Sequence, residues 1–238
     1  MGRNSFPQYE SAASKKAKAN TALDRARKKN PEIEPVIIEG RTLAKNWWGK
    51  AWNANLESYA DYHNRIGRGK SYVRNNAVLD LKITKGQVVA KVQGSRAKPY
   101  VVEIKIQPLN PLKWEKVIER CNHRIDSLEQ LIAGKFPKEL EVLFTNQQYG
   151  MFPSPKEIHF NCSCPDWASM CKHVAAALYG IGTRLDQNPM MFFELRDLDE
   201  KELVKKSMAI KIESMLKNAG KKSTREIAEE DVLDLFGL

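Results

Sequence analysis

The sequence predicts an α+β fold: an antiparallel β-meander with flanking helices, a small strand–turn–helix unit that binds a metal, and C-terminal helices. Three observations predict it. Apolar residues recur at every second position between Ser71 and Ile106, they recur at helical spacing on both sides of that stretch, and four metal-binding side chains crowd into the thirteen residues that begin at Asn161. The expected units are a basic, disordered arm (1–33), an α+β domain with a basic sheet (34–150), the metal-binding finger (151–190) and a C-terminal helical region (191–238).

The bulk composition bounds the class of protein. The chain has 238 residues and a net charge of +10, and its four cysteines are too few for a disulfide scaffold. No stretch approaches the roughly 20 apolar residues of a membrane helix, and the first thirty residues lack the apolar core of a signal peptide. We therefore expect a cytoplasmic protein with no membrane partner, nucleoid-associated if the source is prokaryotic.

The first 33 residues are basic and poor in large apolar side chains, which predicts a loosely ordered arm. Such an arm either solubilises the chain or attracts phosphate backbones through counterion release. Within residues 1–30 only Glu10 and Asp24 oppose the cations, which are Arg3, Lys15, Lys16, Lys18, Arg25, Arg27, Lys28 and Lys29.

Folding is expected to begin at "EPVIIEG" (34–40), a short strand closed by Gly40. The stretch 42–62 then has helical spacing, with Trp48 and Tyr59 flanking an apolar side. We expect this aromatic stripe to be core, and base stacking is the alternative. The apolar side of this expected helix consists of Leu43, Trp47, Ala51, Trp52 and Leu56.

Three strands are expected next, at 77–84, 87–95 and 100–107, as a meander with one solvent-exposed face. Between Asn64 and Pro99 only Asp80 opposes the cations. The cations are Arg65, Arg68, Lys70, Arg74, Lys82, Lys85, Lys91, Arg96 and Lys98.

Helical spacing returns at 112–123, 125–134 and 137–145, and again after the cysteine cluster from Val174. Asp199 and Glu202 form a capping box for a helix that Gly220 ends. A last, acidic helix is expected over 225–236.

The stretch "NCSCPDWASMCKH" (161–173) predicts one structural Zn²⁺ ion bound by Cys162, Cys164, Cys171 and His173. Residues i and i+2 of a strand point to the same side, so the first two cysteines can bind one ion. The last two ligands can converge only if Cys171 precedes the first helical residue and His173 lies in the first turn, because two helical steps rotate by about 200°.

Other interpretations of these residues remain open. The cysteines could form a buried apolar cluster, Cys162 and Cys164 could be a redox pair, or the zinc could be catalytic. Asp166 is the one nearby acid and also suits a turn. His159 could compete with His173, and "CNH" (121–123) is expected to belong to a helix.

The spacing Cys-x-Cys-x6-Cys-x-His, entered from a strand and followed by an Ala-rich helix, resembles the SWIM zinc finger over about residues 155–185. Pro165 and Lys172 agree with that pattern. The upstream stretches 46–57, 67–104 and 109–117 resemble prokaryotic SWIM proteins that are often encoded beside Swi/Snf-type ATPases. The resemblance implies binding of nucleic acid or protein and fixes no substrate.

The function we expect is a non-catalytic, zinc-stabilised accessory protein that binds nucleic acid, in particular DNA, with weak sequence specificity and partners a Swi/Snf-type ATPase. The glycines of "IGRGK" (66–70) would let the backbone approach a phosphate. The alternatives are a solvated basic sheet face, or a protein-interaction adaptor that uses the finger and the acidic last helix. The expected phosphate contacts are Arg65, Arg68, Lys70, Arg74, Arg96, Lys98 and Lys172.

Overall fold

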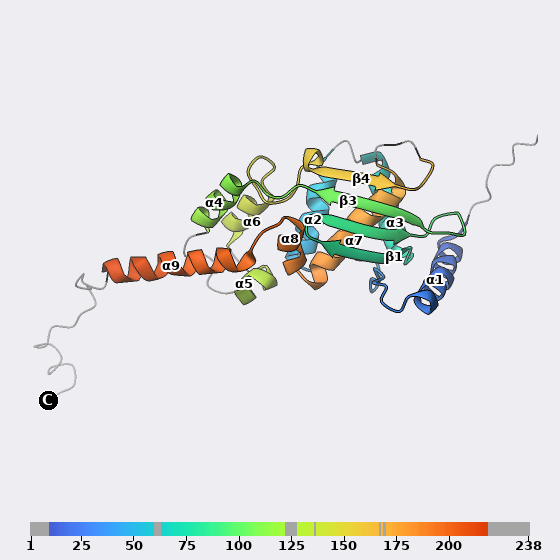
Figure 1. Cartoon of the computed structure of the whole chain (residues 1–238), viewed down its shortest axis with the longest axis horizontal. Helices are drawn as coiled ribbons and strands as arrows, with labels where there is room; N and C mark the ends of the chain where they lie inside the picture. The colour runs from blue at the N-terminus through green and yellow to red at the C-terminus, as the bar shows by residue number, and fades with distance from the viewer. Residues whose placement is uncertain are drawn as a thin grey trace, which may run out of the picture.

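A four-stranded antiparallel sheet in the order β1-β2-β3-β4 organises the molecule (Figure 1). The computed structural model describes residues 10–59, 63–121, 128–135, 137–166, 168 and 170–218. The strands are β1 (Val78–Thr84), β2 (Gln87–Val92), β3 (Tyr100–Ile106) and β4 (Ile158–Cys162). The predicted α+β class with an antiparallel meander is confirmed, and the strand that leads into the cysteine cluster joins the same sheet as its fourth member.

The meander forms because β-branched residues alternate with polar ones and because Gly86 supplies the positive φ of 66° that the β1–β2 turn requires. Along β3 buried and exposed residues alternate strictly. One face is covered by helices, whereas the other leaves side chains such as Val89 and Val101 exposed. The expected solvent-exposed face is therefore present.

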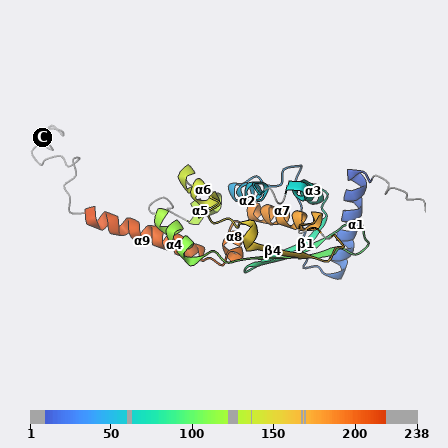
Figure 2. The same cartoon turned by 90° about the horizontal axis from the view of Figure 1, so that it is seen from above.

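Helix α7 (Lys172–Gln187) lies between the sheet and the pair α2 (Trp47–Glu57) and α3 (His63–Arg74), as Figure 2 shows from above. This position explains its Ala-rich sequence, because a helix packed on all sides must be apolar all round. At the crossing with α3, a Cβ on Gly69 would lie 2.6 Å from the carbonyl carbon of Ala175. Gly69 therefore allows a close helix–helix approach.

The tryptophans of α2 belong to the core, as expected. Trp48 and Trp52 are fully buried, and their ring N–H groups donate to the carbonyls of Leu131 and Leu178 at 2.9 and 2.8 Å. Trp48 is thus central rather than flanking, whereas Trp47 is only partly buried. These rings are not available to stack on bases.

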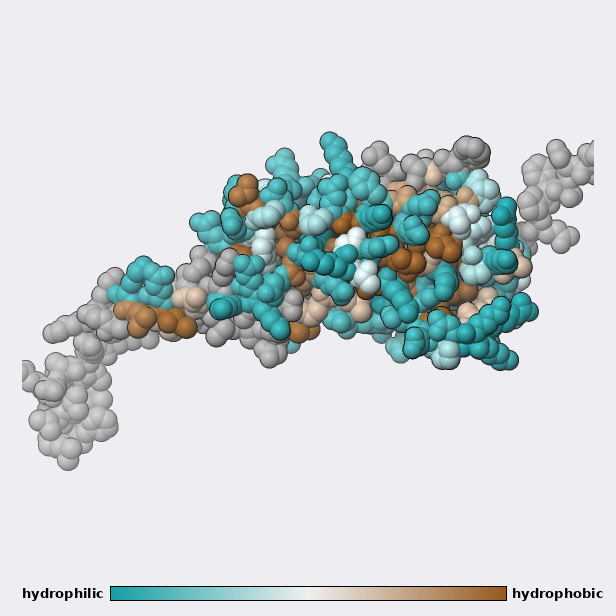
Figure 3. Space-filling view, in the orientation of Figure 1, coloured by the Kyte–Doolittle hydropathy of each residue, from teal (hydrophilic) through white to brown (hydrophobic). Residues whose placement is uncertain are grey.

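The remaining helices cover the end of the sheet opposite α1 (Ala12–Lys29) and extend beyond it. Helix α9 (Glu200–Asn218) projects from the body, and hydrophobic side chains gather on its outer part in Figure 3. No described helix is long and apolar enough to cross a membrane. The others are α4 (Pro111–Arg120), α5 (Leu128–Ala133), α6 (Lys138–Thr145), α8 (Met190–Leu195) and the short 3₁₀ helix η2 (Pro155–Glu157).

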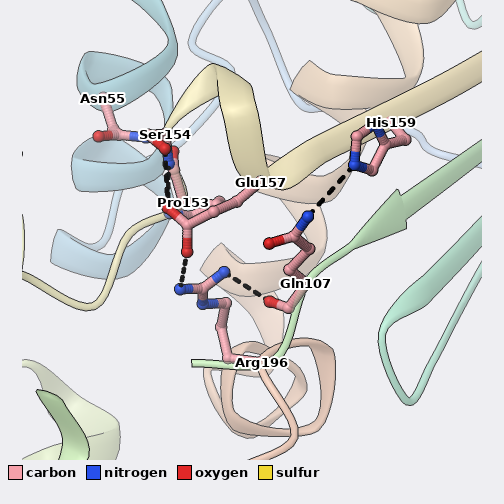
Figure 4. A network of polar contacts seen from close by, with 7 residues as sticks. All are labelled: Asn55, Gln107, Pro153, Ser154, Glu157, His159 and Arg196. Carbon is pink, nitrogen blue, oxygen red and sulfur yellow. Dashed lines mark hydrogen bonds and ion pairs between the residues drawn. The ribbon is translucent and has the colours of Figure 1, made fainter. Parts of the chain in front are cut away.

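An ion pair between Arg196 and Glu157 connects the end of α8 to the short helix η2 (Figure 4). The guanidinium of Arg196, which is fully buried, donates to the Glu157 carboxylate at 2.7 Å and to the Gln107 carbonyl at 2.7 Å. The amide of Gln107 in turn lies 3.3 Å from the His159 ring. The segment after α8 is thereby fastened to the ends of β3 and η2.

Two expectations for the N-terminal region are wrong. Residues 12–29 are not a loosely ordered arm but helix α1 (Ala12–Lys29), capped by the Ser11 hydroxyl and held on the sheet by buried Ala19 and Leu23. Alanine favours a helix, and cations in its last turn suit the helix dipole. Residues 34–40 form no strand. Pro35 has no N–H to donate to a ladder, and this segment is linked to β1 by single hydrogen bonds from the amides of Val36, Leu81 and Glu34, the last to the Asp80 carboxylate.

The core is continuous from Val36 to Leu203 and runs across the boundary expected at 150/151. Residues 66–70, whose glycines were expected to let the backbone approach a phosphate, lie in α3, and Gly69 packs against the backbone of Ala175. Gly220 and the helix expected over 225–236 lie outside the described residues.

Candidate functional site

The four predicted metal ligands come together. The sulfur atoms of Cys162, Cys164 and Cys171 and a ring nitrogen of His173 all lie within 4.8 Å of one another. The imidazole presents Nδ1, which is 3.9 Å from Sγ of Cys162 and 3.8 Å from Sγ of Cys171. Donors of a tetrahedral zinc site with Zn–S bonds of about 2.3 Å are roughly 3.5–3.8 Å apart. The cluster therefore fits one bound metal ion, which could be zinc.

The local fold explains why the donors converge. Cys162 ends β4 opposite Val102, on the sheet face that the helices cover, and Cys164 follows two residues later. Helix α7 begins at Lys172 with Cys171 as its N-cap, and the Val174 amide donates to the Cys171 sulfur at 3.5 Å. This is the register that the sequence predicts, and it is confirmed.

The protonation of the metal-free cluster is asymmetric. A hydrogen bond from the Cys162 thiol, helped by His173 and the Val174 amide, holds the pKa of Cys171 well below its ordinary value despite burial. The same interaction, together with burial, raises the pKa of Cys162. One thiolate is thus available before a metal arrives, and the positive end of α7 favours it.

Aromatic rings and a glycine surround the imidazole of His173. Its ring centroid is 4.4 Å from that of Tyr100 and 5.5 Å from that of Tyr72. Burial, more than any neighbouring charge, raises the pKa of Tyr72 to about 12. The outer nitrogen, Nε2, is buried against Gly94 and has no hydrogen-bond partner among the described residues. The loop between β2 and β3 therefore packs directly on the Cys/His cluster.

The residues that could compete as metal ligands lie in other surroundings. His159 is exposed, pairs with Lys105 in the sheet and lies beside Gln107. Cys121 is the buried C-cap residue of α4, and the rest of "CNH" lies outside the described residues. Asp166 accepts from the Ala168 amide at 3.2 Å, in a turn, and from Arg65 at 2.9 Å.

The predicted phosphate contacts do not form a single path, because α3 divides them. Arg65 is paired with Asp166, Lys70 with Glu57 at 2.9 Å, and Arg74 donates to a backbone carbonyl at 3.1 Å. Arg96 lies over the Tyr100 ring at 5.9 Å. Of the four positions in α3, Arg68 alone faces the same cleft as Lys172.

That cleft, here called the first cleft, has a volume of about 390 Å³. Its walls are α1, α3, the β2–β3 loop and the start of α7, and Tyr72 and Gly94 connect it to His173. Within the described chain, no carboxylate pairs with Arg68 or Lys172. Its charged lining residues are Lys15, Lys18, Arg68, Lys172 and Glu10.

Sequence reasoning missed Lys15 and Lys18 as members of this site. Lys18 donates to the Ser95 carbonyl at 3.0 Å and lies 3.9 Å from Glu10. The only signal in the sequence is the helical spacing of the cations beside Ala19 and Leu23. It indicates which side of α1 is basic, but not which cleft that side meets.

Comparison with known proteins adds one relative. The chain is 32% identical over 183 residues to the uncharacterized protein Rv2102 of Mycobacterium tuberculosis (strain ATCC 25618 / H37Rv). The match covers 73% of this chain and 66% of the relative, slightly under two thirds of its length. No family model matches the chain, and no solved structure matches it.

Proposed function

We propose that the protein is a non-catalytic nucleic-acid-binding accessory protein in which one structural Zn²⁺ ion holds a basic cleft in shape. The observation that carries the proposal is the first cleft. Cations from three separate segments, α1, α3 and α7, converge in a space that borders the Cys/His cluster. Charges gathered from distant parts of a chain repel one another, and an anionic ligand offsets that cost.

A structural role suits the metal better than a catalytic role. Four protein donors complete a tetrahedral shell, so no position remains for a water molecule or substrate. The nearest described acid, Asp166, is engaged by Arg65 and by a turn amide. The donor set and its strand–helix setting agree with a SWIM-type finger, and we carry over from that resemblance a Swi/Snf-type ATPase as the partner.

Phosphate groups are the anions that fit this surface best. Arg68 and Lys172 supply charge without carboxylate partners in the described chain, and α7 begins at Lys172, so the positive end of its dipole lies beside the cleft. No base-reading helix is needed for such contacts, so we expect binding to DNA with weak sequence preference and steep salt dependence.

The test is the double variant Arg68→Ala/Lys172→Ala, with Lys82→Ala/Lys105→Ala on the sheet as a control that removes the same charge. Binding of fluorescent DNA is measured by anisotropy at several salt concentrations. Each lost phosphate contact should lower the slope of log K against log salt by roughly 0.7–0.9, so the cleft variant should lose up to about two units and the control none. Metal content of all proteins is checked in parallel. Wild-type protein that binds no nucleic acid at low salt would refute the proposal.

A second candidate function, a protein-interaction adaptor, is favoured by the outer face of α9. Ile212, Met215 and Leu216 are 54%, 62% and 70% exposed on a helix that projects from the body (Figure 3). Exposed apolar side chains grouped in this way are typical of docking surfaces. The variant Met215→Glu/Leu216→Glu should abolish capture of a partner ATPase while leaving DNA binding unchanged.

A further inference from the structure

A second basic cleft lies on the other side of the β2–β3 loop. It has a volume of about 360 Å³ and shares Gln93 and helix α1 with the first cleft. Asp80, its acidic residue, is already paired with Lys91 at 3.3 Å and accepts from the Glu34 amide. Its cationic lining residues are Arg25, Lys29, Lys91 and Lys98.

Helix α1 connects the two clefts. Lys15 and Lys18 line the first cleft, and Arg25 and Lys29 line the second. These residues are spaced at i, i+3, i+10 and i+14, which places them along one side of a helix. Hydrophilic side chains cover this end of the molecule in Figure 3. The other α1 cations, Lys16, Arg27 and Lys28, line neither cleft.

The second cleft is apolar beneath its charged rim. Ile33, Leu79 and Pro99 form part of its lining, together with alanines of α1. A duplex presents phosphate and sugar to such a surface and keeps its bases stacked inside. An unpaired strand presents apolar base faces as well as phosphates, which is the combination that single-strand-binding grooves use. Both clefts also have the size of pockets that hold one small ligand, roughly 300–1,000 Å³.

We infer that a single strand of nucleic acid runs along α1, from Arg68 and Lys172 in the first cleft, past the Lys18–Ser95 contact, to Arg25, Lys29 and Lys98 in the second. This inference rests on the proposed nucleic-acid-binding function and specifies its substrate class. The fourteen helical steps from Lys15 to Lys29 span about 21 Å. At roughly 3.4 Å per stacked nucleotide, the track holds about six nucleotides.

The experiment compares two double variants of the same helix. Arg25→Glu/Lys29→Glu reverses charge in the second cleft, and Arg27→Glu/Lys28→Glu makes the same change in net charge near the same helix end but outside both clefts. Anisotropy is measured with deoxythymidine and uridine oligonucleotides of about 3, 6 and 12 nucleotides and with a duplex. Circular dichroism verifies that each protein is folded.

We expect tighter binding to single strands than to the duplex, and affinity that rises from about 3 to about 6 nucleotides and then levels off. The second-cleft variant should bind the longer strands at least tenfold more weakly, and the control variant less than threefold. Equal losses in the two variants, or a duplex bound as tightly as the single strand, would overturn the inference while the proposed function stood. Absence of binding to every nucleic acid would overturn both. The deoxythymidine and uridine arms tell which of the two strand types binds more tightly.

Discussion

A Cβ atom on Gly94 would lie 2.8 Å from Nε2 of His173, so the β2–β3 loop is packed against the Cys/His cluster with no space for a methyl group. The same Cβ would lie 2.5 Å from the ring of Tyr100, which contacts the imidazole at a tilt of 34°. Gly94 also lines the first cleft. The shape of the cleft and the position of His173, one of the four potential metal ligands, are therefore mechanically linked.

Replacing Gly94 with alanine should disturb both features. The added methyl group must displace the imidazole or Tyr100, and overpacking of this kind costs about 1–3 kcal/mol. Because His173 would lose its position, metal affinity should fall roughly tenfold or more. Competition with a chromophoric chelator measures the affinity. Ser95→Ala, at the exposed neighbouring position, should leave it unchanged. A Gly94→Ala protein with unaltered metal affinity would contradict the packing described here.

Loss of the metal should unfold more than a small finger. Cys171 caps α7, and α7 lies at the centre of the core between the sheet and two helices. We expect Cys171→Ser, or removal of the metal by a chelator, to abolish the cooperative unfolding transition, since a closed zinc site contributes folding free energy directly. Cys121→Ala removes a buried thiol outside the cluster and should retain one metal ion per chain by elemental analysis. Retention of a cooperative transition in both metal-free forms would contradict this prediction.

Alanine substitutions at two glycines of α3 should change the stability of the protein in opposite directions. Gly69→Ala forces a methyl group against the backbone of Ala175 and should destabilise the protein by about 1–3 kcal/mol. Gly67→Ala meets no atom within 4 Å and should stabilise it by about 0.5–1 kcal/mol through helix propensity. Urea denaturation of both variants measures the difference. Equal effects would mean that α3 does not approach α7 as closely as described.

The sequence is informative where one short segment determines geometry. The alternation in β2 and β3, the same-side placement of Cys162 and Cys164, and the start of α7 after Cys171 all follow from local periodicity and capping, and the structure has them. Local sequence patterns predict α3 less well. Its two glycines suggested a backbone that approaches a phosphate, but both lie in a helix, where Gly69 packs against Ala175.

The basic clefts could not be predicted, because they depend on long-range packing. Nothing near Lys15 in the sequence indicates that α1 lies beside Lys172, and burial of Ala19 and Leu23 on the sheet brings them together. Residues of the same charge in α3 also do not share one site. Arg68 and Lys70 are two residues apart and face different neighbours, because helical geometry rotates them by about 200°.

The Glu157–Arg196 pair should give the protein an acid-sensitive component of stability. Burial would raise the pKa of Glu157, but hydrogen bonds from Ser154 and the Arg196 guanidinium outweigh it, so the pKa lies below the ordinary 4.5. A carboxyl with a lowered pKa stabilises the folded state fully above its ordinary pKa, and this contribution is lost as the pH falls through the folded value. Near neutral pH, Glu157→Gln leaves the buried Arg196 uncompensated and should cost about 3–5 kcal/mol in chemical denaturation. Below about pH 4.5 the difference from wild type should shrink.

Glu213→Gln is the control, because Lys217 also lowers the pKa of Glu213 but the pair lies on the surface of α9, where water screens it. That control should be as stable as wild type at every pH. A constant gap between Glu157→Gln and wild type from pH 7 to pH 3 would show that the loss arises from altered packing and not from charge.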